Sequence, residues 1–153
     1  MNLEIQKFKN QILAFDFLSE LGFSFLEEEL YNENKAKETF YRYQLKNNLN
    51  KVISITYYPC NRLVTSNEIE VILIYPKGGS TGLSEYLAYK KLNKKLTHED
   101  VLPYRFKVDC NKLTESILLQ LNNISNLLNG EFKKYLITEE FLFIPTHDPR
   151  DNY

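Results

Sequence analysis

The chain has 153 residues, of which 43% are hydrophobic and 25% are charged, and its formal net charge is −1. A chain of this length and composition can bury a hydrophobic core of its own, which excludes an intrinsically disordered protein. The near-neutral charge gives no overall attraction to nucleic acid or to acidic membranes, and no run of about eighteen apolar residues predicts a membrane span.

The first predicted element is a helix over residues 5–21. Apolar side chains recur along it at helical spacing: Ile5, Phe8, Ile12 and Phe15. Gly22 follows at the position where a left-handed backbone conformation commonly ends a helix. We expect Phe23 to fold back onto the last helical turn.

Four strands are predicted next, over residues 23–31, 38–46, 51–58 and 67–75. The second strand has clear alternation, with Tyr41, Tyr43 and Leu45 on one face and Phe40, Arg42 and Gln44 on the other. The first strand is rich in aromatic residues and glutamate, and its alternation is broken. The links between strands are short and polar, which favours antiparallel pairing. The sequence therefore predicts a four-stranded antiparallel meander.

Helical periodicity returns after the glycine-rich loop at 78–82. Two helices are predicted, over residues 83–95 and 110–129. Asp109 is the expected N-cap of the second helix, and Gly130 is the expected residue that ends it. The apolar stripe of this second helix consists of Leu113, Ile117, Leu121, Ile124 and Leu128.

The C-terminal part continues with a short helical turn from Phe132 to Leu136. Residues 137–144 are apolar enough to pack on the core or to add an edge strand, and residues 146–153 are expected to fray. A helix, four strands and further helices follow one another in separate blocks, which is the pattern of a single α+β domain over residues 1–153. The predicted core includes Ile12, Leu18, Ile55, Val71, Leu121 and Ile124.

The polar motifs form no recognised catalytic or metal-binding pattern. The Gly78–Gly82 loop lacks the spacing of phosphate-binding loops, which favours a simple connection. The adjacent side chains of His98–Asp100 point in different directions on a helix, so they would not bind one metal ion or share one proton. Thr97 as an N-cap, followed by acidic residues in the first helical turn, accounts for the same residues without a function. We therefore expect a protein that is not an enzyme and needs no cofactor or metal. Carboxylates such as Glu68 and Glu70 could still converge into a hidden site.

The two cysteines, Cys60 and Cys110, are fifty residues apart and have no zinc-binding or redox-motif spacing. No apolar segment of signal-peptide type follows Met1, so a cytoplasmic location is expected. In that reducing compartment two free thiols are the favoured state, and a single structural disulfide is the alternative.

Charge is distributed unevenly along the chain. Residues 1–40 carry eight acidic and four basic side chains, whereas residues 77–112 carry eight basic and four acidic ones. The acidic side chains are candidates for binding a basic protein: Glu20, Glu27, Glu28, Glu29 and Glu33. The lysines of the 83–95 helix are candidates for a nucleic-acid surface: Lys90, Lys91, Lys94 and Lys95. A pI of about 6.2 makes nucleic acid the less favoured partner.

The order of elements resembles a known group of proteins. The residues that carry the resemblance are the opening Phe17–Phe23, the aromatic strands Phe40–Tyr43 and Ile53–Tyr58, and the later Leu127–Phe132. This layout resembles small uncharacterised bacterial proteins encoded beside polymorphic or contact-dependent toxins, some of which are interpreted as immunity proteins. The resemblance implies a noncatalytic protein that neutralises a cognate toxin by tight stoichiometric binding. The alternative is a small nucleic-acid-associated regulator that uses the lysines.

Overall fold

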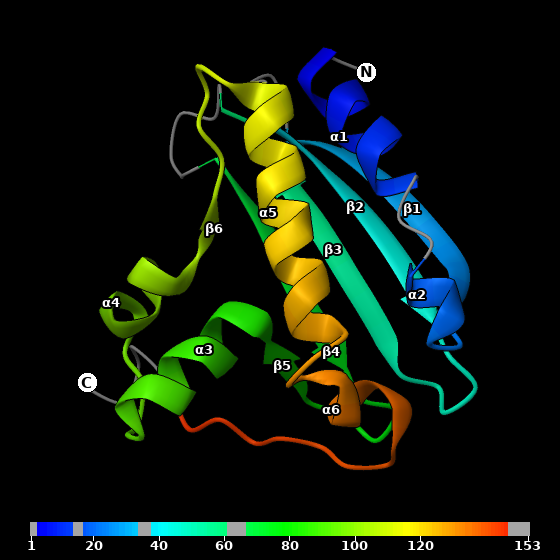
Figure 1. Cartoon of the computed structure of the whole chain (residues 1–153), viewed down its shortest axis with the longest axis vertical. Coiled ribbons are helices and arrows are strands. Elements are labelled where there is room, and N and C mark those ends of the chain that lie inside the picture. Colours follow the sequence, from blue (N-terminus) through cyan, green and yellow to red (C-terminus); the bar gives the residue numbers. More distant parts are fainter. Residues whose placement is uncertain (1–2, 14–16, 34–37, 61–66, 147–153) are drawn as a thin grey trace.

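The computed structural model describes residues 3–13, 17–33, 38–60 and 67–146. It shows an α+β fold with an antiparallel sheet, and Figure 1 shows the helices α1, α2 and α5 in front of that sheet. No helix in these described ranges is long and apolar enough to cross a membrane.

The predicted first helix is described in two parts, α1 (Leu3–Leu13) and α2 (Phe17–Glu20), and residues 14–16 between them lie outside the described residues. Gly22 has a φ of 87° and ends α2, as predicted. The Phe23 backbone N–H donates to the Leu18 carbonyl at 3.0 Å, and the Phe23 side chain is buried. This is the Schellman arrangement, in which a left-handed glycine lets the chain fold back onto the helix.

The sheet contains the four predicted strands and two short additional ones. The strands are β1 (Ser24–Glu33), β2 (Glu38–Lys46), β3 (Val52–Tyr58), β4 (Glu68–Ile74), β5 (Ser80–Gly82) and β6 (Phe106–Lys107). All pairs are antiparallel, and the first four strands follow the order β1-β2-β3-β4. Both β5 and β6 pair with the edge of β4 that does not pair with β3. The predicted number of strands was too low, because strands of three and two residues are too short to show an alternating pattern in the sequence.

From Leu83 on, the described residues contain four further helices and one 3₁₀ turn. They are α3 (Leu83–Leu92), α4 (His98–Val101), η2 (Leu102–Tyr104), α5 (Leu113–Leu128) and α6 (Lys133–Ile137). The prediction of Asp109 as the N-cap of a helix over residues 110–129 was wrong, because α5 begins only at Leu113 and Lys112 stands at its N-cap position. The Asp109 carboxylate instead accepts a hydrogen bond from the Asn111 backbone N–H at 2.9 Å. Gly130 follows α5 without a positive φ. A Cβ there would lie 2.7 Å from the Asn126 carbonyl oxygen, so this glycine permits a close approach.

The hydrophobic core lies between one face of the sheet and the helices. On this inner face β2, β3 and β4 contribute three buried rows: Tyr41, Tyr57 and Ile69; Tyr43, Ile55 and Val71; Leu45, Ile53 and Leu73, of which only Tyr43 is partly exposed. The predicted core residues are all buried: Ile12, Leu18, Ile55, Val71, Leu121 and Ile124. The opposite, outer face carries mainly polar residues, and a shallow hollow there is lined by Arg42, Gln44, Ser54, Glu70, Ile72, Ile74, Gly79 and Ser80.

A disulfide joins Cys60, just after β3, to Cys110, just before α5. The expectation of two free thiols was therefore wrong. The two cysteines are fifty residues apart in the sequence, and only the folded chain brings them together. A local sequence pattern therefore could not predict this pairing. The Cys60 backbone N–H also donates to the Glu4 carboxylate at 2.6 Å, so α1 is anchored at the same corner.

The segment after α6 packs on the rest of the chain and forms no strand within its described residues. The buried Lys51 donates from Nζ to the carbonyl oxygens of Tyr135 and Glu140, each at 2.5 Å. Burial lowers the pKa of this ammonium group. The Thr81 hydroxyl donates to the Leu142 carbonyl at 2.7 Å. The predicted frayed tail lies outside the described residues from residue 147 on.

Candidate functional site

The most exposed element of the sheet is its edge strand β1. All of its residues from Ser24 to Tyr31 are exposed, and in the described part of the chain only β2 pairs with it. Four large apolar side chains are among the exposed ones: Phe25 (56%), Leu26 (43%), Leu30 (43%) and Tyr31 (41%). Edge strands of soluble proteins are normally protected against further pairing, so this combination marks β1 as a candidate binding surface.

The acidic run of β1 is divided between the two faces of the sheet. Glu28 lies opposite the inward-facing Tyr43, whereas Glu27 and Glu29 lie opposite the outward-facing Gln44 and Arg42. Successive side chains of a strand point to opposite faces, which separates Glu28 from Glu29. A bulge between Phe25 and Glu27 shifts the register so that Glu27 also faces outward. The broken alternation in the sequence is the signal of this bulge.

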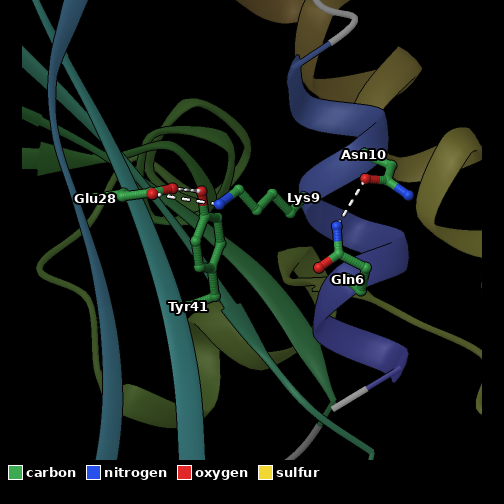
Figure 2. Close-up of polar contacts among 5 residues, drawn as sticks. All are labelled: Gln6, Lys9, Asn10, Glu28 and Tyr41. Carbon is green, nitrogen blue, oxygen red and sulfur yellow. Dashed lines mark hydrogen bonds and ion pairs between the residues drawn. The ribbon is translucent and has the colours of Figure 1, made fainter. Parts of the chain in front are cut away.

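Glu28 is held by side chains of two other elements, as Figure 2 shows. The Tyr41 hydroxyl of β2 donates to Glu28 Oε2 at 2.5 Å, and Lys9 Nζ of α1 donates to Oε1 at 3.2 Å. The hydrogen bond from Tyr41, and after it Lys9, holds the pKa of the Glu28 carboxyl below its usual value. Burial, followed by the negative charge of Glu28, raises the pKa of the Tyr41 phenol. The charge of Glu28 is therefore balanced within the protein.

The lysine in this network is presented by the side of α1 that faces β1. Lys9 also lies 5.9 Å from the centroid of the Tyr41 ring. One turn away on the same helix, Gln6 donates to Asn10 at 2.9 Å, and Figure 2 shows that this pair does not take part in the Glu28 network. Sequence reasoning selected Glu28 but missed Lys9 and Tyr41, because α1 and β2 meet β1 only in the folded chain.

The negative charges of the two outward-facing glutamates are less well balanced by nearby positive charges. Glu29 lies 3.6 Å from Arg42 Nη1, a long ion pair between partly exposed groups. Arg42 is itself engaged by the sheet, since its Nε donates to Thr56 Oγ1 at 3.0 Å and its guanidinium lies 4.9 Å from the Phe40 ring centroid. The Glu27 side chain makes no ion pair or hydrogen bond with any described residue. The outer side of β1 therefore keeps negative charge.

The other predicted acidic residues do not join this group in the same way. Glu20 is exposed at the end of α2, and Glu33 is the last residue of β1, where its backbone pairs with Glu38. The structure thus places Glu27, Glu28 and Glu29 on one strand but on two faces. The prediction of one acidic surface is refined to an acidic outer side and a charge-balanced inner side.

The predicted lysine face is not formed. α3 ends at Leu92 because Asn93 adopts a left-handed conformation with a φ of 48°. Lys94 and Lys95 therefore lie beyond the helix, and the expected pairing of lysines one turn apart was wrong. Lys90 forms an ion pair with Glu131, and Lys94 lies 3.3 Å from Asp100. Lys91, the fourth lysine of the group, is exposed near the end of α3.

The other polar motifs have structural roles. Thr97 caps α4, as predicted, and it forms a reciprocal capping box with Asp100. The hydrogen bonds from the Thr97 backbone and side chain lower the pKa of the Asp100 carboxyl. Gly78 and Gly79 have positive φ values and form the tight turn between β4 and β5. No group of three His, Cys, Asp or Glu side chains in the described ranges is placed to hold a metal ion.

Some dispersed carboxylates do converge. Glu68, Glu70 and Glu85 line a small cavity beside Arg105, where β5 and β6 leave the middle of β4 uncovered. Glu68 lies 3.6 Å from Arg105 Nη1. Burial, followed by the charge of Glu70, raises the pKa of the Glu85 carboxyl, and Arg105 opposes this rise. Arg105 thus balances part of the charge of this cluster.

Comparison with protein-family models, with curated proteins and with solved structures finds no match to this chain. The candidate site is therefore argued from its own geometry. That geometry combines an unpaired strand edge, exposed apolar side chains and two outward-facing glutamates.

Proposed function

We propose that this protein is a noncatalytic binding protein whose interface is β1, and that it acts as an immunity protein which neutralises a cognate toxin by stoichiometric binding. The observation that carries this proposal is the exposure of Phe25, Leu26, Leu30 and Tyr31 on a strand edge that has no partner in the described ranges. A partner that covers β1 would remove this apolar surface from water.

The charge of the strand supports a basic partner. Toxins that act on nucleic acids are commonly basic, since they must hold phosphate groups. The outward-facing Glu27 and Glu29 would complement such a surface, and complementary charge mainly raises the rate of association. The nucleic-acid alternative has weaker support, because Lys90 and Lys94 are already paired with acidic residues.

The compartment of this binding event is part of the proposal. The sequence favoured the cytoplasm, but the Cys60–Cys110 disulfide is typical of an oxidising compartment. We therefore propose that the protein binds its toxin in an oxidising compartment, in which the disulfide stays intact. Thiol trapping in intact cells before lysis tests this, since a cytoplasmic protein with free thiols would be labelled at both cysteines.

Site-specific crosslinking tests the interface. A photoreactive residue at Leu30 should capture one protein partner in the source cells after nuclease treatment. The matched control is a photoreactive residue at Phe143, which is 76% exposed but lies on the C-terminal segment. Capture from position 143 and not from position 30 would place the interface elsewhere and contradict the proposal.

The captured partner is then purified for binding and inhibition assays. It should bind in a 1:1 ratio and lose its toxic activity when bound. The double variant Glu27→Lys/Glu29→Lys should bind more slowly, most clearly at low salt, whereas Glu115→Lys on α5 should bind normally. A partner whose activity is unchanged by saturating protein would refute the immunity function.

A further inference from the structure

The two sides of β1 differ in their chemical character. The inner side presents the exposed Phe25 and Leu30, with Glu28 between them. Because Tyr41 and Lys9 already bind the Glu28 carboxylate, this side needs no further cation. The outer side presents Glu27 and Glu29, two residues apart, followed by Tyr31, which stacks on Phe40. The edge is thus apolar and charge-balanced on one side and acidic on the other.

The backbone of β1 offers a second feature to a partner. The strand has ten residues, and in the described part of the chain its hydrogen bonds are made with β2 alone. An edge of this length exposes alternate N–H and C=O groups that an extended chain can bind in register. Side-chain recognition would then follow the alternation of the strand.

A second copy of this chain is a poor occupant of this edge. Residues opposite each other in an antiparallel pair share one face of the sheet. Pairing of β1 with itself centred on Glu28 would therefore place the two Glu28 side chains opposite each other on the inner face, and Glu27 opposite Glu29 twice on the outer face. Like charges directly opposite each other destabilise strand pairing. The charge pattern therefore favours a different, basic chain.

We infer that β1 accepts an extended segment of the partner protein as an additional strand, with basic side chains at alternate positions over Glu27 and Glu29 and apolar side chains against Phe25 and Leu30. This inference rests on the proposed function, because both use β1. It adds the mode of binding and the sequence pattern of the partner segment: alternating basic and apolar residues over about the length of β1.

Synthetic peptides test the pattern independently of the natural partner. The probe is an acetylated and amidated ten-residue peptide in which lysine and valine alternate, as long as β1 itself. One control has the same composition with its lysines and valines in two blocks, and another carries a central proline that cannot donate to a strand ladder. A third control alternates glutamate and valine.

Two measurements are made with each peptide: binding by titration calorimetry, and amide hydrogen exchange of the protein. The alternating lysine peptide should bind saturably and slow exchange at alternate amides of β1, because those amides become hydrogen-bonded. The double variant Glu27→Lys/Glu29→Lys should bind it roughly tenfold or more weakly, since attractive contacts become repulsive ones. Glu115→Lys should bind it unchanged, and circular dichroism checks that each variant is folded.

Several results would overturn the inference. They are equal binding of the block peptide, slowed exchange outside β1, or unchanged β1 exchange at millimolar peptide. The proposed function fails differently, through crosslinks that avoid Leu30 or a partner that is not inhibited. A partner that crosslinks at Leu30 and is inhibited, but leaves the β1 amides unprotected, would refute strand addition while leaving the immunity function in place.

Discussion

The disulfide between Cys60 and Cys110 allows a prediction of stability. Replacing both cysteines by serine removes a cross-link that closes a loop of fifty residues. The chain-entropy relation gives about 4 kcal/mol of stabilisation for a loop of this length at 25 °C, by restricting the unfolded chain. For a protein of this size that loss corresponds to a fall in Tm of roughly 10 °C.

The assay is urea denaturation followed by circular dichroism, with and without a thiol reductant. The free energy of unfolding of the wild-type protein should fall by about 4 kcal/mol on reduction, to the value of the Cys60→Ser/Cys110→Ser variant. That variant should not respond to the reductant, which makes it the control for effects of the reductant alone. Exchange of amides near Glu4 should also quicken, because the Cys60 N–H bonds its carboxylate.

Two results would refute this reasoning. One is the titration of two free thiols in unreduced, urea-unfolded protein, since this would mean that the cross-link does not form. The other is a change of less than about 1 kcal/mol on reduction, which would mean that the unfolded chain is already restricted without the bond.

Two further predictions concern the core and the Glu28 network. Leu121→Ala or Ile124→Ala should lower the free energy of unfolding by about 2–5 kcal/mol, because both side chains are buried on α5. Leu119→Ala, exposed on the same helix, should change it by less than about 0.5 kcal/mol, and a similar cost at both kinds of position would contradict the packing. Tyr41→Phe should cost about 1 kcal/mol near neutral pH, a value reduced for the partial exposure of Glu28. Because the folded-state pKa of Glu28 is lowered, this contribution is present above its unfolded pKa and lost as pH falls through the folded value. Tyr43→Phe is the control, and an equal loss at acidic and neutral pH would argue against a bond to ionised Glu28.

Much of the fold follows from short-range patterns. The strands β2, β3 and β4 were predicted to within one residue at each end, because alternation with a period of two is visible over seven or more residues. The stripe of α5, the glycine that ends α2 and the Thr97 capping box are equally local. Each depends on residues no more than a few turns apart, which is the distance over which a sequence pattern can be read.

The candidate site depends on contacts between distant segments. The sequence identifies the glutamates of β1, but the bulge after Phe25 decides which of them face outward, and Lys9 and Tyr41 decide that Glu28 is already bound. The Cys60–Cys110 bond and the burial of Lys51 beneath the segment after α6 are decided in the same way. Chain entropy opposes each of these approaches, and only the packing of the whole core outweighs it. Local periodicity therefore determined the elements, whereas tertiary packing decided which charges stay free to meet a partner.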